Sequence, residues 1–202
     1  MQQLRDLYFQ AEGYLLEGGM VIVPIILISF VMWTLIFNRL LFFRRLHRKN
    51  MSRVEAGRCI RHGELPDPRL HRGITGLLVK RFLMKKTGKR AVDKHILDET
   101  VMHYLSSLDN YLSVIRVLAG TAPLLGLLGT VTGMIATFDT IAGFGTGNAR
   151  AMAGGISEAL ITTQSGLLVA IPGLYMSNFL KRRAEILKQR LASVGFYLLN
   201  YI

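Results

Sequence analysis

Cysteine, acidic residues and charges within the apolar stretches are the scarce features of this sequence. The single Cys59 excludes an intrachain disulfide, so the chain is not a disulfide-stapled secreted domain. Only 13 Asp and Glu residues stand against 25 Lys and Arg, and the formal net charge is +12. Half of the residues are nevertheless hydrophobic. This combination excludes a soluble enzyme and a disordered chain, because the apolar and basic residues must be segregated along the sequence.

Three stretches, 18–38, 117–138 and 159–180, contain no Asp, Glu, Lys or Arg over 21, 22 and 22 residues. As a helix rising about 1.5 Å per residue, each would be about 32 Å long, close to the ~30 Å hydrocarbon thickness of a bilayer. None alternates apolar and polar residues, which excludes an outer-membrane barrel. The sequence therefore predicts an all-α integral membrane protein with three transmembrane helices.

The basic residues indicate how these helices are oriented. Most of them lie between the first and second stretches or after the third, whereas only Arg5 and Arg150 lie on the opposite side. By the positive-inside rule, the N-terminus faces outward and the C-terminus inward. The net charge is then a topology signal with an attraction for anionic phospholipids, and we expect no nucleic-acid partner.

We expect seven segments along the chain. Apolar residues between Leu4 and Leu15 follow a helical stripe and predict an amphipathic outer segment. From Ala91 an amphipathic pattern continues into the second stretch and predicts one uninterrupted long helix extending into the cytoplasm. The expected segments are a periplasmic amphipathic segment at 1–17, a transmembrane helix at 18–40, a basic helical cytoplasmic region at 41–115, a second transmembrane helix at 116–140, a short periplasmic connection at 141–155, a third transmembrane helix at 156–180 and a cytoplasmic C-terminal helix at 181–202.

Small and hydroxylated residues recur at helical spacing in the second and third stretches. Such faces let helices approach closely, and their hydroxyls can bond the helix backbone. Ordinary helix packing and the lining of a conduit both fit this pattern. The residues concerned are Gly126, Gly129, Thr130 and Gly133 in the second stretch, and Thr163, Gly166 and Gly173 in the third.

Two acids border these stretches. Glu158 directly precedes the third stretch, and Asp139 directly follows the second. A carboxylate at the edge of a bilayer is costly and usually faces protein, water or a cation. Glu158 fits either a conduit or an interfacial anchor, whereas Asp139 fits a boundary residue.

The interiors of all three stretches lack Asp, Glu, His, Lys and Arg. If the protein conducts protons, the central titratable group must therefore come from a partner. The five histidines show no HExxH or paired Cys/His spacing, and no nucleophile has a base beside it in a known motif. We therefore expect no metal site, no cofactor and no enzymatic activity.

Three ordered stretches carry a family resemblance: TAPLLGLLGTVTGMI at 121–135, GISEALITT at 155–163 and GLLVAIPG at 166–173. They closely resemble the MotA/TolQ/ExbB proton-channel family, and its ExbB branch most. The resemblance implies a proton-channel subunit of the bacterial inner membrane in a TonB-type biopolymer transport system. It implies a homopentamer around two ExbD-like single-span subunits, each with a membrane Asp, and a TonB-like protein that receives the energy.

The family's pore threonines correspond to Thr130 and to Thr163, which follows Glu158 by five residues. The sequence departs from the family at Gln164 and Ser165, where smaller apolar residues are common. Three alternatives remain open: a TolQ-like subunit of the Tol-Pal envelope system, a non-conducting membrane scaffold and a MotA-like flagellar stator subunit. The last is disfavoured because no additional span can be placed.

Overall fold

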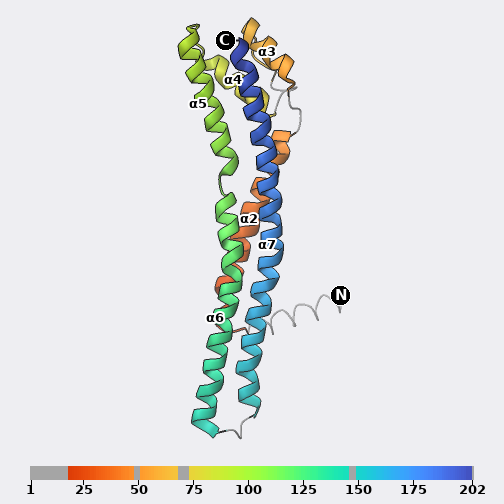
Figure 1. Ribbon diagram of the computed structural model, residues 1–202. Helices are drawn as coiled ribbons and strands as arrows, with labels where there is room; N and C mark the ends of the chain where they lie inside the picture. Colours follow the sequence, from red (N-terminus) through yellow and green to blue (C-terminus); the bar gives the residue numbers. More distant parts are fainter. Residues whose placement is uncertain (1–17, 48–50, 68–72, 146–148, 202) are drawn as a thin grey trace, which may run out of the picture. The chain divides into compact units, whose positions relative to one another are not determined.

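The computed structural model describes residues 18–47, 51–67, 73–145 and 149–201, so the predicted amphipathic segment 1–17 lies outside the described residues. Every regular element among the described residues is helical, which confirms the predicted all-α class (Figure 1). The elements are α2 (Ile22–His47), α3 (Arg53–His62), α4 (Ile74–Lys85), α5 (Arg90–Asp109), α6 (Leu112–Phe144), α7 (Ala149–Leu198) and the 3-10 helix η2 (Leu199–Tyr201).

Helices α2, α6 and α7 contain the three stretches that are long and apolar enough to cross a membrane, as predicted. Helix α6 extends to Phe144 and α7 begins at Ala149, so helix covers most of the expected short connection 141–155. The third transmembrane helix and the C-terminal helix of the prediction are parts of one element, α7, which has 50 residues.

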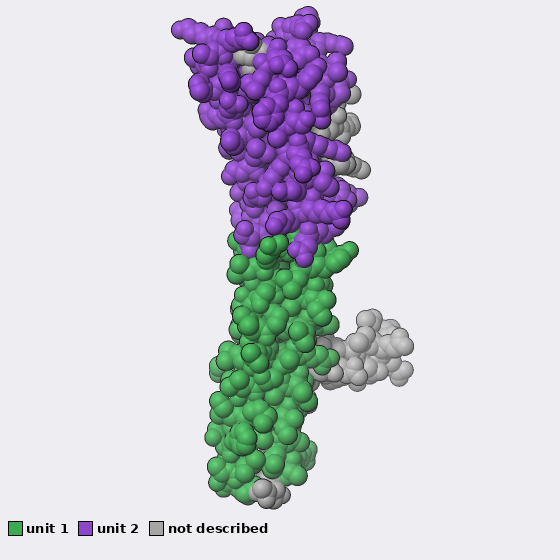
Figure 2. All heavy atoms as spheres, in the orientation of Figure 1, with its two compact units in different colours: residues 1–36, 114–177 green, residues 37–113, 178–202 purple. Residues whose placement is uncertain are grey.

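The chain forms two compact units, coloured separately in Figure 2. Unit 1 comprises 1–36 and 114–177, and its described part is built from α2, α6 and α7. Its interior contains small side chains such as Ala122 and Ala170 together with Ile25 and Met32. Unit 2 comprises 37–113 and 178–202, and its interior is formed by larger apolar side chains such as Phe82, Leu97 and Leu191.

Helix α3 in unit 2 has local stop and start signals at both ends. Ser52 accepts a hydrogen bond from the Glu55 amide at 3.2 Å, and the Glu55 carboxylate accepts one from the Ser52 amide at 3.0 Å. Such a capping box stabilises a helix start by about 1 kcal/mol. Gly63, at a φ of 72°, ends the helix in the left-handed conformation that glycine adopts without steric cost.

The turn between α4 and α5 is organised by Asp93, which lies in α5 well before the uncharged stretch of α6. Its buried carboxylate accepts hydrogen bonds from the Thr87 amide at 2.7 Å, the Thr87 hydroxyl at 2.9 Å and the Gly88 amide at 3.0 Å. These bonds hold the pKa of Asp93 below its usual value, with the Thr87 amide making the largest contribution.

The prediction of one uninterrupted helix from Ala91 into the second stretch is wrong. Helix α5 ends at Asp109 and α6 begins at Leu112. Between them, Asn110 is extended at φ −50° and ψ 135°, and Tyr111 has a φ of 63°, which is rare for a residue other than glycine. The apolar periodicity continues across this interruption, so the pattern alone gives no sign of it.

Candidate functional site

Glycines bring the backbones of α6 and α7 into direct contact in unit 1. A Cβ atom on Gly126 would lie 3.1 Å from the Thr162 carbonyl oxygen, and one on Gly133 would lie 2.7 Å from the Gly155 carbonyl oxygen. A Cβ atom on Gly166 would lie 2.7 Å from the Ala122 carbonyl oxygen. Any side chain at these positions would push the two helices apart.

Gly173 lies where α7 packs against α2, the first apolar helix. A Cβ atom there would lie 2.5 Å from the Met32 sulfur of α2 and 3.1 Å from the Ala119 Cβ of α6. Met32 is fully buried, with 0% of its surface exposed. The absent side chain of Gly173 therefore makes room for α2 against α6 and α7.

Thr162 occupies the space left by Gly129 on α6. It is fully buried, and its hydroxyl lies 2.9 Å from the Glu158 carbonyl oxygen and 3.0 Å from the Ala159 carbonyl oxygen. Sequence reasoning assigned it no role, although a signal was present. Thr162 belongs to a row of small residues on α7 at alternating spacings of four and three, namely Gly155, Ala159, Thr162 and Gly166.

Thr163 is half-buried and makes a hydrogen bond from α7 to α6. Its hydroxyl lies 3.1 Å from the Gly126 carbonyl oxygen of α6 and 3.1 Å from the Ala159 carbonyl oxygen of its own helix. Thr130, also half-buried, donates to the Leu127 carbonyl oxygen of its own helix at 2.6 Å. Within the described chain, no hydrogen bond joins Thr130 and Thr163 to each other.

These bonds determine what the two hydroxyls offer to a further group. A threonine hydroxyl has one proton to donate and two lone pairs that accept. Because backbone carbonyls take the protons of Thr130 and Thr163, each oxygen is left as an acceptor. Such an oxygen stabilises a water or a protonated carboxyl group better than it stabilises a carboxylate, which can only accept.

The side chain of Glu158, a residue of α7, lies beside the turn that precedes α2, the first apolar helix. It is partly buried, and a Cβ atom on Gly19 would collide with its carboxylate. Gly19 belongs to the turn that precedes α2, where a negative charge interacts favourably with the helix dipole. Neither Glu158 nor the exposed Asp139 forms an ion pair with any residue that the structure describes.

Residues 66–193 match the family described as the MotA/TolQ/ExbB proton channel family. The chain belongs to this family. The match includes Thr130, Glu158 and Thr163 and confirms the resemblance that the sequence motifs indicated. The family is one of proton channels, and the three apolar helices make this member a membrane protein of the bacterial envelope.

Several proteins with related names are similar to the chain. An ExbB-like biopolymer transport protein of Synechocystis is 29% identical over 189 residues, which cover 89% of this chain and 74% of that protein. The biopolymer transport protein ExbB of Salmonella typhimurium is 26% identical over 87% of this chain and 77% of its own length. ExbB of Neisseria gonorrhoeae is 39% identical over 87 residues, which cover 43% of this chain and only 40% of that protein.

Arg39 is a further residue to which the sequence analysis assigned no role. It lies in α2 directly after the first uncharged stretch and is only 5% exposed. Its Nη2 donates to the Ser107 carbonyl oxygen at 2.7 Å and to the Leu108 carbonyl oxygen at 3.2 Å. Its guanidinium also lies 5.8 Å from the ring centroid of Tyr111. Arg39 thus supplies the hydrogen bonds that the end of α5 loses where the helix is interrupted.

Proposed function

We propose that this chain is the proton-channel subunit of an ExbB-ExbD-TonB type complex in the bacterial inner membrane. The complex would couple the proton motive force to energised transport across the outer membrane. Family membership and the relatives named ExbB support this role over a TolQ-like subunit or a non-conducting scaffold. The proposed topology has the N-terminus outside and the C-terminus inside, as the basic residues indicate.

The observation that carries the proposal is the chemistry of the contact between α6 and α7. The apolar spans of this proton-channel family member have no Asp, Glu, His, Lys or Arg, yet Thr130 and Thr163 present oxygens that can only accept. A conduit of this kind needs a mobile acid from elsewhere. A membrane Asp on an ExbD-like single-span partner would supply it.

The proposed mechanism uses the protonated and charged forms of the partner's Asp differently. The neutral acid donates a hydrogen bond to the hydroxyl oxygen of Thr130 or Thr163. This hydrogen bond is lost when the acid ionises. Loss of the proton toward the cytoplasm therefore releases the partner helix, and reprotonation from outside lets it bind again. Each proton crossing 100 mV supplies about 2.3 kcal/mol from the electrical term.

An oligomer, which we propose is a homopentamer around two partner helices, is supported by an apolar groove in unit 1. The groove, about 810 Å³, lies between α2 and α7 and includes Phe30, Trp33, Gln164 and Leu168. Gln164 is exposed and has no hydrogen bond to any residue that the structure describes. Because an unpaired amide is unfavourable in hydrocarbon, a neighbouring chain that covers Gln164 would be stabilised there.

The proposal is tested by native mass spectrometry after gentle extraction of the tagged chain, with sequencing of the proteins that co-purify. We expect five copies of this chain with two copies of a single-span protein that has an Asp within its span. A TonB-like protein among the other companions would identify the transport system. Rings of this chain alone, under conditions that retain lipid, would contradict the proposal and favour the scaffold.

A further inference from the structure

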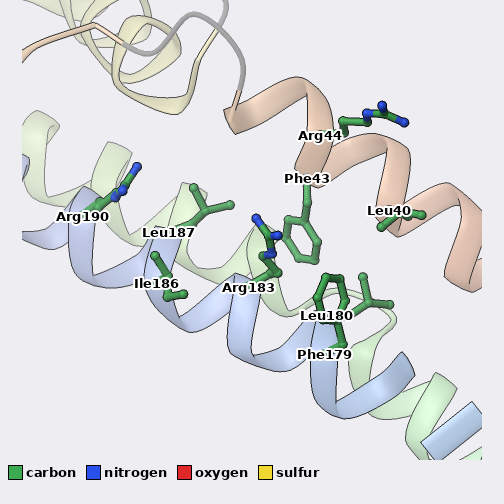
Figure 3. A pocket seen from close by; sticks show the side chains of 9 residues that line it. All are labelled: Leu40, Phe43, Arg44, Phe179, Leu180, Arg183, Ile186, Leu187 and Arg190. Carbon is green, nitrogen blue, oxygen red and sulfur yellow. The ribbon is translucent and has the colours of Figure 1, made fainter. Parts of the chain in front are cut away.

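A cavity in unit 2 combines an apolar wall with three arginines (Figure 3). It has a volume of about 440 Å³ and lies between the end of α2 and the adjoining part of α7. Phe43 and Leu187 are among the apolar side chains that line it, and the cations are Arg44, Arg183 and Arg190. Phe43 of α2 and Arg183 of α7 point toward each other across the opening (Figure 3).

The arginines leave their positive charges available to a ligand. Neither Arg44 nor Arg190 has a hydrogen bond or an ion pair among the described residues, and Arg183 only stacks on Phe179, with its Cζ 5.2 Å from the ring centroid. None of the described residues that line the cavity has a carboxylate. The acid nearest in sequence on α7, Glu185, lies 3.5 Å from Lys188. An anion beside Arg183 or Arg190 therefore meets no opposing charge among the described lining residues.

The cavity also begins where the apolar stretches end. The uncharged stretch of α2 ends at Asn38 and that of α7 at Leu180, while the cavity extends from Leu40 and Phe179 to Arg190. The apolar lining of the cavity thus follows the uncharged stretches directly in sequence, and Arg183 comes only three residues after Leu180, within reach of the headgroup layer. Arg183 and Arg190 lie seven residues apart on one face of α7.

We infer that this cavity binds a glycerophospholipid with an anionic headgroup. Guanidinium groups match phosphate oxygens with paired hydrogen bonds, which lysines and neutral side chains do not reproduce. An acyl chain fits along Phe43 and Leu187, as an apolar wall requires. By the proposed orientation the lipid belongs to the cytoplasmic leaflet, although the site itself does not depend on proton conduction.

Native mass spectrometry of the purified complex, titrated with phosphatidylglycerol or with phosphatidylcholine of the same acyl chains, tests the site. We expect one tightly retained phosphatidylglycerol per chain, at about a tenfold lower concentration than phosphatidylcholine. The double variant Arg183→Gln with Arg190→Gln should lose this preference. The control Lys181→Gln with Arg182→Gln removes the same charge from exposed residues of α7 that do not line the cavity, and should keep it.

A second variant keeps all three arginines and fills the apolar wall. Leu40→Trp, at a half-buried position, should weaken phosphatidylglycerol retention several-fold while the complex keeps its mass and helicity. Equal retention of the two lipids, equal losses in both charge variants, or full retention in Leu40→Trp would each overturn the assignment. Lipid bound to dissociated chains but absent from the intact oligomer would also overturn it, because a neighbouring copy would then fill the cavity.

Discussion

The Thr163 hydroxyl of α7 lies 3.1 Å from the carbonyl oxygen of Gly126 on α6. This contact is possible because Gly126 has no side chain, since a Cβ atom there would lie 3.1 Å from the Thr163 Cα. Gly126 therefore lets the helices approach, and its carbonyl oxygen shares the hydrogen bond of the Thr163 hydroxyl with the Ala159 carbonyl oxygen. Packing and the proposed proton chemistry depend on one contact, so experiments must separate the two.

Helix contact is tested at Gly133. Alanine there should destabilise the protein by about 1–3 kcal/mol, because its Cβ would overlap backbone atoms of α7 that cannot move independently. Gly120→Ala is the matched control, since nothing lies within 4 Å of its Cβ position on the same helix. Thermal unfolding in a fixed detergent measures both variants. Equal melting temperatures for the two variants would show that the close approach at Gly133 is unimportant.

The position of Glu158 is tested by a double-mutant cycle with Gly19. Gly19→Ala incurs two costs, a contact with the Glu158 carboxylate and a φ of 61°. Gly145→Ala measures the second cost alone, about 1 kcal/mol, because Gly145 has a φ of 68° and nothing within 4 Å. Adding Glu158→Ala should reduce the cost of Gly19→Ala toward that of Gly145→Ala. Strict additivity of the two substitutions would contradict a destabilising contact between the Cβ atom that Gly19→Ala introduces and the Glu158 carboxylate.

Asp93 should make stability depend on pH. Its folded pKa is lowered by hydrogen bonds from Thr87 and Gly88, so its stabilising contribution is present above the unfolded pKa and is lost as the pH falls through the folded pKa. Asp93→Asn should therefore lower stability at pH 7, and the difference from the unsubstituted protein should shrink in acid. Asp98→Asn, at an exposed position of the same helix, should show no such pH dependence. A constant difference from pH 7 to pH 3 would contradict this account.

Arg39 should be required at the interruption between α5 and α6. Arg39→Met keeps much of the buried volume but removes the bonds to the Ser107 and Leu108 carbonyls, and should cost about 2–4 kcal/mol. Arg45→Met, at an exposed position of α2, is the control. Hydrogen exchange across residues 105–113 should accelerate in the first variant only. Unchanged hydrogen exchange across these residues in Arg39→Met would contradict a stabilising role of Arg39 at the end of α5.

The interruption also shows the limit of what the sequence predicts. Three uncharged stretches were sufficient to predict three apolar helices, since the bilayer thickness sets their length. The break at Asn110 and Tyr111 has neither glycine nor proline, and the carbonyls that it exposes are bonded by Arg39, 68 residues away from Ser107. The apolar periodicity near residues 110 and 111 contains no information on a partner so far away in the sequence.

At the candidate site, helical spacing placed Thr163 and the glycines on faces that the structure does bring together. The same spacing did not distinguish Thr163 from its neighbour Thr162, which is the fully buried residue of the pair. One position along a helix is a rotation of about 100°, and only the partner helix decides which side chain is enclosed.

The central claim, that Thr163 supports proton passage, is most directly tested by proton flux in proteoliposomes that contain the chain with its single-span partner. An entrapped pH dye reports flux under an imposed potential. Thr163→Val keeps the shape but removes the acceptor, and should lower flux about 10- to 100-fold. Thr163→Ser should retain it, and Thr162→Val, which alters a buried packing hydroxyl, should leave flux per intact complex unchanged. Full flux in Thr163→Val, with the complex intact, would contradict the account.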